Sequence, residues 1–160
     1  MAKYAENTSV SSSRSRDEIE RTLTKYGATQ FAYAWQEGAA LIGFVLGGKQ
    51  VRLVLPLPDR KAREFTHTPG RGLLRSQAQQ EEAYEQAVRQ KWRAIALVVK
   101  AKLEAVESGI SVFEREFFYD IVLPDGRTVG EYALPQVEES YRSGIVPPML
   151  PALGNGGGLK

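Results

Sequence analysis

Residues 76–109 read SQAQQEEAYEQAVRQKWRAIALVVKAKLEAVESG, which is the longest helical signal in the sequence. Ser76 predicts an N-cap with Gln79 at the third helical position, and Gly109 predicts the end of the helix. Apolar side chains recur at intervals of three and four residues, the spacing of one helix face. They are Trp92, Ile95, Val99, Leu103 and Val106, preceded on the same face by Tyr84 and Val88. The stretch therefore predicts a long helix packed against the rest of the domain.

Positive charge gathers on a second side of this helix. Arg89, Arg93 and Lys100 lie there with Ala96 between them, and we call these three basic side chains the basic ridge. Lys91 and Lys102 add further charge to the same helix. The ridge runs beside the apolar stripe, so the helix is expected to have both a packing face and a candidate binding face.

A second group of basic side chains lies immediately before the helix. Residues 59–75 read DRKAREFTHTPGRGLLR and are called the basic loop here. Its basic residues are Arg60, Lys61, Arg63, Arg71 and Arg75. A connection of this length in a compact domain is usually functional or disordered.

The stretch before the basic loop predicts a sheet. FAYAW (31–35), ALIGFVL (40–46) and VRLVL (51–55) have the composition of strands, with turns at 36–38 and at GGKQ (47–50). The shortest connections give a three-stranded antiparallel meander. Arg52 interrupts an apolar strand, so one sheet face is expected to be solvated or to contact a partner.

Helices are predicted on either side of this central part. A short one, DEIERTLTKY (17–26), is expected to follow an N-cap on Ser15, with Glu18 completing a capping box. Two more are expected after the long helix, opened by the capping pairs Ser111 with Glu114 and Thr128 with Glu131. The sequence thus predicts an α+β fold with a disordered arm (1–14), one domain (15–144) and a flexible Pro/Gly-rich tail (145–160).

Composition limits the classes of function. The 160 residues contain no cysteine, which excludes disulfides and thiolate chemistry. The N-terminus lacks the apolar core of a signal peptide, and no apolar run reaches the roughly 18 residues of a membrane span, so we expect a cytoplasmic protein without membrane contact. Residues 49–103 carry a net charge of +7 and residues 104–160 a net charge of −5. The two segments either neutralise each other or leave the basic one facing a polyanion.

Residues with catalytic or metal-binding chemistry are few. His67, the single histidine, lies in a polar loop, and no metal or cofactor motif surrounds it. Glu116 and Asp120 would share a helix face, but paired carboxylates without further ligands are typical of a solvated surface. We therefore expect no enzyme activity, no metal and no cofactor.

Two functions remain open. The first is non-catalytic binding of nucleic acid, with single-stranded DNA favoured, because arginine and lysine neutralise phosphates and Phe65, Tyr33 or Trp35 could stack on bases. Its site would comprise Arg52, Arg60, Lys61, Arg63, Arg71, Arg75, Arg89, Arg93 and Lys100. The alternative is a protein–protein adaptor or inhibitor that acts through the sheet face, the acidic C-terminal helices or the tail. Either function is compatible with a homo-oligomer.

The predicted order of elements over residues 16–109 (helix, three-strand meander, long helix) is similar to the core of phage single-strand annealing proteins. Those proteins bind DNA in a basic groove and form rings. The stretches RSRDEIERTLTKYGA (14–28) and IVLPDGRTVGEYALP (121–135) also resemble small uncharacterised phage proteins. The resemblance implies an accessory role in phage replication or recombination. It concerns topology, so no residue roles are carried over.

Overall fold

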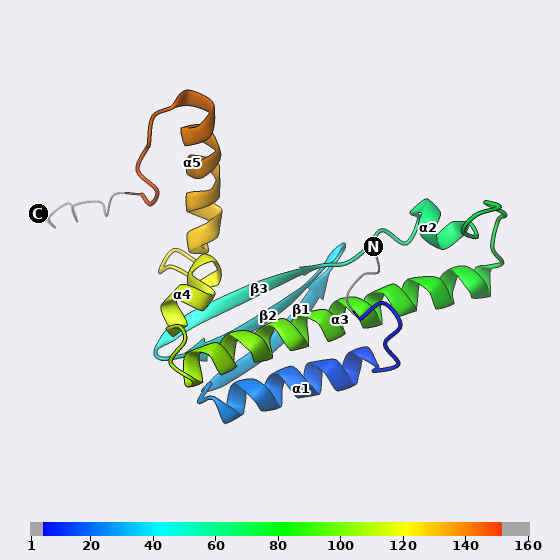
Figure 1. Ribbon diagram of the computed structural model, residues 1–160, viewed down its shortest axis with the longest axis horizontal. Coiled ribbons are helices and arrows are strands. Elements are labelled where there is room, and N and C mark those ends of the chain that lie inside the picture. Colours follow the sequence, from blue (N-terminus) through cyan, green and yellow to red (C-terminus); the bar gives the residue numbers. More distant parts are fainter. Residues whose placement is uncertain (1–4, 152–160) are drawn as a thin grey trace, which may run out of the picture.

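The computed structural model describes residues 5–151 and confirms the α+β fold (Figure 1). In chain order the elements are α1 (Ser12–Lys25), β1 (Gln30–Gln36), β2 (Ala39–Leu46), β3 (Lys49–Pro56), α2 (Arg63–Thr66), α3 (Gln77–Glu107), α4 (Phe113–Phe117), the 3-10 helix η1 (Phe118–Asp120) and α5 (Val129–Ser143). The predicted order of helix, meander, long helix and C-terminal helices is confirmed. The short helix α2 inside the basic loop was not predicted.

The three strands form the predicted antiparallel meander in the order β1-β2-β3. A two-residue turn, Gly47–Gly48, joins β2 to β3, with φ values of 57° and 74°. Glycine adopts this left-handed backbone without the steric cost that a side chain brings. Lys49 and Gln50, expected in the turn, therefore already belong to β3, where they pair with Leu46 and Val45.

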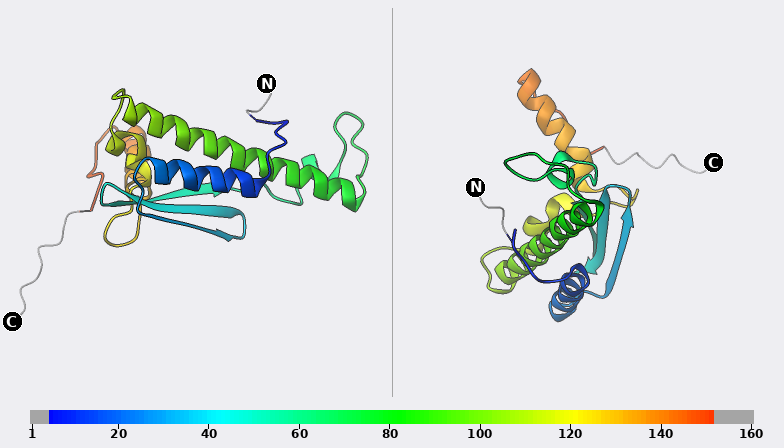
Figure 2. Two further views of the ribbon diagram at one scale, coloured as in Figure 1. Left: turned by 90° about the horizontal axis from the view of Figure 1, so that it is seen from below. Right: turned by 90° about the vertical axis from the view of Figure 1, so that its right-hand side faces the viewer.

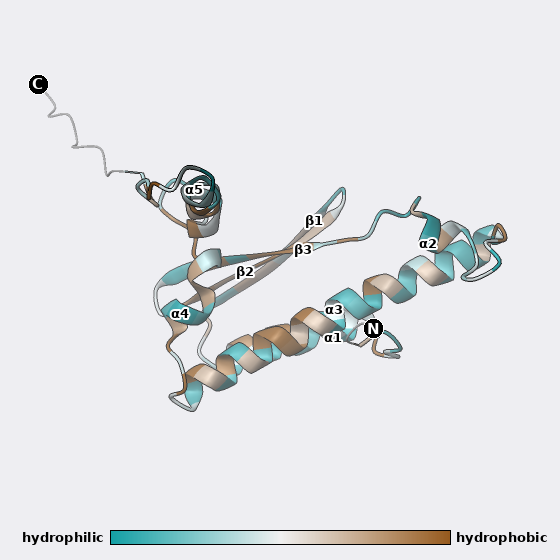
Figure 3. Ribbon diagram, turned by 45° about the horizontal axis from the view of Figure 1, so that its top comes forward, coloured by the Kyte–Doolittle hydropathy of each residue, from teal (hydrophilic) through white to brown (hydrophobic). Residues whose placement is uncertain are grey.

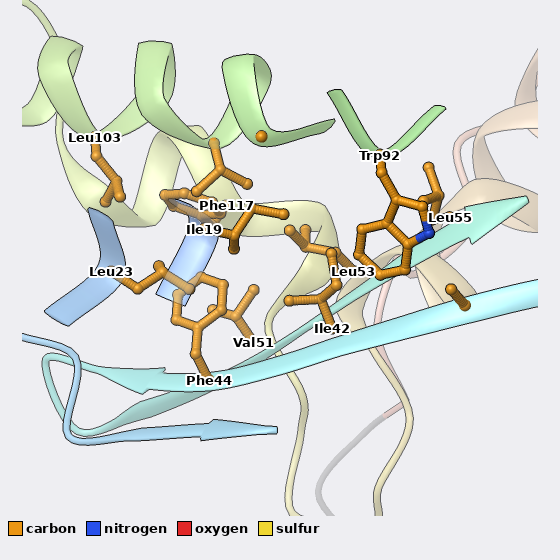
Figure 4. Close-up of a cluster of buried hydrophobic side chains, with 13 residues drawn as sticks. Ile19, Leu23, Ile42, Phe44, Val51, Leu53, Leu55, Trp92, Leu103 and Phe117 are labelled. Atoms are coloured by element: carbon orange, nitrogen blue, oxygen red, sulfur yellow. The ribbon is translucent and has the colours of Figure 1, made fainter. Parts of the chain in front are cut away.

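Helices α1 and α3 lie side by side on one face of the sheet, and no helix of residues 5–151 covers the other face (Figure 2). The core fills the space between the helices and the sheet (Figure 4). It combines Ile19 and Leu23 of α1, Ile42 and Phe44 of β2, Val51, Leu53 and Leu55 of β3, Trp92, Val99 and Leu103 of α3, and Phe117 of α4. Alternation along β2 and β3 directs every second side chain into this layer.

The apolar stripe of α3 holds the two layers together, with one correction. Trp92, Val99 and Leu103 are buried as predicted, but the fourth buried residue is Ala96, whereas Ile95 is half-buried. Ala96 was placed between the charges of the basic ridge. It is buried because α1 packs against that side of α3, where a small side chain allows close approach. The elements that form the core are also the hydrophobic ones. The strands and the middle of α3 are hydrophobic, whereas α2 is largely hydrophilic (Figure 3).

The start of α1 differs from the prediction. Ser11 is the N-cap and its hydroxyl accepts a hydrogen bond from the backbone N–H of Arg14 at 3.2 Å. Ser15, the predicted cap, lies inside the helix and is fully buried. The segment before Ser11 runs along α3, where the side-chain amide of Gln86 donates to the carbonyls of Glu6 and Thr8.

The first C-terminal helix also begins differently. Val112 precedes α4 without a side-chain cap, so the expected capping by Ser111 is wrong. The backbone N–H of Ser111 instead donates to the carbonyl of Ala105 at 3.0 Å, which ties this residue to the end of α3. The predicted pair Thr128 and Glu131 does form a capping box, and it opens α5.

Helix α5 projects away from the body of the molecule (Figure 1). It continues through Pro135 to Ser143 and is capped by Gly144, whose φ of 74° is the left-handed conformation typical of a glycine at the end of a helix. Part of the predicted tail, residues 152–160, lies outside the described residues. Within residues 5–151, no helix is both long and apolar enough to cross a membrane.

Candidate nucleic-acid interface

A cleft of about 450 Å³ opens between the start of α1, the beginning of the basic loop and the first half of α3. Three arginines from distant parts of the chain line it: Arg16, Arg60 and Arg89. We call this site the arginine cleft. Its other lining residues are Ser11, Ser12, Ser13, Glu81, Tyr84, Glu85 and Val88. The first turn of α1 contains no acidic side chain, so the positive end of the helix dipole at the cleft is not neutralised by its own helix.

Arg60 is held in the cleft by two contacts with α3. Its guanidinium forms an ion pair with Glu81 and lies 4.1 Å from the centre of the Tyr84 ring. The hydrogen bond from Arg60 to Glu81 raises the pKa of the guanidinium further above its already high value. The first residues of the basic loop are thereby fixed against the long helix.

Arg16 occupies the cleft from the α1 side and was missed by sequence reasoning. Its guanidinium lies 4.8 Å from the ring centre of Tyr33 and 5.2 Å from that of Trp92. Both distances are in the range of cation–π attraction. The spacing of residues could have predicted its position. Arg16 precedes Ile19 by three residues and Leu23 by seven, which places its side chain on the buried face of α1.

Arg89 is the one residue of the basic ridge that reaches the cleft. Its side chain donates to the amide oxygen of Gln86, at 3.0 Å from Nε and 2.7 Å from Nη2, and pairs with Glu82 at 3.0 Å. The same Gln86 holds the segment before α1. Arg89 is therefore positioned by a network that also fixes the start of α1.

Exposed aromatic side chains lie on the neighbouring strand β1. Trp35 is 77% exposed and Tyr33 is 47% exposed, and both are on the sheet face that also carries the core. Phe65, the third expected stacking residue, is unsuited to this role because it is buried edge-to-face against Tyr84. Tyr33 is thus the exposed ring in contact with Arg16, and Trp35 continues the same face of β1.

Three other predicted site residues do not line the cleft. Arg52 donates to the carbonyl of Gly126 at 2.9 Å and pairs with Glu131 at 3.0 Å, at the base of α5. Arg93 pairs with Glu18 of α1, so the middle of the basic ridge faces α1. We call the line along which α1 and α3 pack together the helix seam. Lys100 is exposed further along this seam. These three side chains do not form one surface with the cleft.

The remaining predicted residues, Lys61, Arg63, Arg71 and Arg75, belong to the end of the molecule formed by α2 and the loop after it (Figure 1). We call residues 66–75 the tip loop. Its backbone is closed by hydrogen bonds from Thr68 N–H to Leu73 O at 2.8 Å and from Arg75 N–H to Thr66 O at 2.8 Å. The tip loop is thus closed by its own hydrogen bonds, whereas Arg60 and Phe65 attach the first half of the basic loop to α3.

His67 contacts the side chain of the residue before it. Its Nδ1 lies 2.8 Å from the hydroxyl of Thr66, and across residues 5–151 no three His, Cys, Asp or Glu side chains gather closely enough to hold an ion. Comparison of the chain with family models, curated proteins and solved structures gave no match.

Proposed function

We propose that this protein binds nucleic acid without catalysing a reaction, and that it favours single strands. The observation that supports this proposal is the convergence of Arg16, Arg60 and Arg89 in one cleft, where Arg16 contacts the exposed ring of Tyr33. The exposed ring of Trp35 lies two residues further along the same face of β1. Arginines that follow a backbone next to aromatic stacking surfaces are the usual arrangement in single-strand binders. Such a protein would suit an accessory role in replication or recombination.

Carboxylates already present in the cleft set the strength of such binding. Glu81 pairs with Arg60, and Glu82 and Glu85 lie near Arg89 at 3.0 and 3.9 Å. A phosphate must compete with these groups for the guanidinium donors. Arginine can exchange a carboxylate for a phosphate because its planar fork fits both groups. We therefore expect moderate affinity with a steep dependence on salt.

The aromatic residues distinguish single from double strands. Bases of a single strand can stack on the exposed rings of Tyr33 and Trp35, whereas the bases of a duplex are already stacked on each other. The phosphates of both forms can reach the arginines. The expected order of affinity is thus single strand above duplex at equal salt.

The test is a fluorescence-anisotropy titration with labelled single- and double-stranded DNA and RNA at several salt concentrations. For wild type, the logarithm of the association constant should fall linearly with the logarithm of salt. In Arg16→Gln and Arg60→Gln, the steepness of that line for single strands should fall by about 0.7 for each arginine removed. Wild-type binding that ignores salt, or no binding at low salt, contradicts the proposal.

Arg115→Gln is the matched control, because Arg115 is exposed on α4, outside the cleft. It removes the same charge and should leave the salt dependence at the wild-type value. Arg60→Gln is the more decisive variant, because half of the Arg60 side chain is exposed and its loss should not disturb folding. Arg16 lies on core Trp92, so the melting temperature of its variant is measured alongside.

A further inference from the structure

Helix α5 presents an apolar surface that the described chain does not cover. Leu134, Val137 and Tyr141 recur at intervals of three and four, and all are exposed, Tyr141 to 89%. Ile145 and Val146 extend this surface beyond the end of the helix. Among the helices and strands of residues 5–151, α5 packs substantially only against η1. We call this surface the α5 stripe.

The base of α5 is fixed, so the stripe is held in one direction. The Thr128 and Glu131 capping box closes its first turn, and Arg52 of β3 pairs with Glu131. Gly130 lies directly against the ring of Tyr119, which leaves no room for a side chain there. A braced helix with a solvent-exposed apolar stripe has the properties of a docking arm.

The tip loop offers a surface of complementary character. Leu73 and Leu74 are exposed there, Leu74 to 73%, and Arg71 and Arg75 flank them in the sequence. The tip loop carries Arg71 and Arg75 and no acidic residue, a net charge of +2. Helix α5 carries Glu131, Glu138, Glu139 and Arg142, a net charge of −2. Apolar contact and charge both favour association of these two surfaces.

A single copy cannot bring the two surfaces together. The tip loop and α5 lie at opposite ends of the molecule, with the length of α3 between them (Figures 1 and 2). We propose that the α5 stripe of one copy docks on the tip loop of a second copy. The contact is heterologous, because it joins different surfaces of the two partners. Each copy keeps one free surface of each kind, so association continues into a ring or an open chain.

Two surface variants test the pairing. The tip variant Arg71→Ser with Leu74→Ser and the arm variant Val137→Ser with Tyr141→Ser each remove one surface without adding charge, and all four side chains are exposed. Sedimentation velocity is measured on nuclease-treated protein. The average mass of the wild-type protein should rise with its concentration, whereas each variant alone should remain a monomer. An equimolar mixture of the two variants should form dimers and nothing larger, because one intact arm and one intact tip remain.

Three results would overturn the proposal. In the first, the wild-type protein stays monomeric up to about 1 mM, the weak end of specific binding. In the second, either variant associates as strongly as wild type. In the third, the mixture of the two variants forms no dimer. Arg60→Gln serves as the control, since the arginine cleft lies outside both surfaces and this variant should assemble normally. Failure of nucleic-acid binding would leave these outcomes unchanged, so the two proposals are tested separately.

Disulfide trapping gives a second measurement, because the chain has no cysteine of its own. Tyr141→Cys and Leu74→Cys should each stay uncross-linked alone and form a disulfide-linked dimer when mixed under oxidation. Val54→Cys, at an exposed position on the uncovered sheet face, reports random collisions. If either variant alone gave as much disulfide-linked dimer as the mixture, the contact would be symmetric and the proposed contact would be excluded.

Discussion

The guanidinium of Arg127 donates a hydrogen bond of 3.1 Å to the backbone carbonyl of Glu131. That carbonyl lies four residues before Pro135, which has no N–H to donate to it. Arg127 therefore supplies the donor that the proline removes, and α5 continues through a residue that usually ends a helix.

This relationship predicts a non-additive pair of substitutions. Arg127→Ala should lower the protection of α5 amides by about 1 kcal/mol, because the Glu131 carbonyl loses its donor. The same change in a Pro135→Ala background should cost much less, because the alanine N–H restores the helical bond. Native-state hydrogen exchange of α5 amides measures both values. Equal costs in the two backgrounds would show that the Arg127 bond does not replace the helical one.

A second prediction concerns the base of α5. Gly130→Ala should destabilise the protein by about 1–3 kcal/mol, because the new methyl group overlaps the ring of Tyr119. In a Tyr119→Ala background the sign should reverse, since alanine is preferred over glycine in a helix by about 1 kcal/mol. Urea unfolding of the four proteins gives the comparison. Gly144→Ala is not a suitable control, because its positive φ brings backbone strain of its own.

A third prediction concerns alkaline pH. The hydroxyl of Tyr26 donates to Glu104 at 2.5 Å, and this hydrogen bond is the main cause that raises the pKa of Tyr26 to about 12. Unfolded tyrosine loses its proton near pH 10, so the folded state binds more protons between about pH 10 and 12. The stabilising contribution is complete below pH 10 and is lost as the pH rises to 12. Tyr26→Phe should flatten this part of the pH–stability curve, and an unchanged curve would contradict the assignment.

A fourth prediction separates Arg52 from the arginine cleft. Arg52→Gln should weaken folding by about 1–2 kcal/mol, because its guanidinium joins β3 to Gly126 and Glu131. It should leave nucleic-acid affinity within error of wild type. Arg60→Gln should show the opposite result, with weaker binding and little loss of stability. Reduced binding by Arg52→Gln at full folding would place the interface at the base of α5 instead.

A fifth prediction uses the two tryptophans as reporters. Trp35 is exposed and Trp92 is 4% exposed, so bound bases should quench the fluorescence of Trp35 alone. Trp35→Ala should cost about 1–3 kcal/mol of single-strand binding and little duplex binding. Fluorescence titration of wild type and variant checks both statements. Quenching that survives in Trp35→Ala would mean that the stacking surface lies elsewhere.

The parts of the fold that were predicted are those whose signals are local. The capping boxes at Ser76 and Thr128, the Gly47–Gly48 turn and the α3 stripe each lie within a few residues of sequence. Helix α1 shows where local signals become ambiguous. Ser11 and Ser15 could both cap a helix, and the choice depends on how α1 packs on the sheet and α3.

The candidate site was harder to predict because tertiary contacts assemble it. Arg60 is 21 residues from Glu81, and Arg93 is 75 residues from Glu18, so their ion pairs cannot be read from spacing. Basic residues that look alike in sequence are therefore divided among a cleft, a helix seam, the tip loop and the base of α5. Arg16 enters the cleft only because α1 lies beside α3.

Helix α3 has a consequence for the dimensions of any assembly. Its 31 residues, at a rise of 1.5 Å each, make a rod of roughly 46 Å between the tip loop and the base of α5. Copies joined through those two ends would be spaced by at least this length. Electron micrographs of an open chain should then show successive contacts separated by about the length of the rod, a spacing set by the helix rather than by the contact itself.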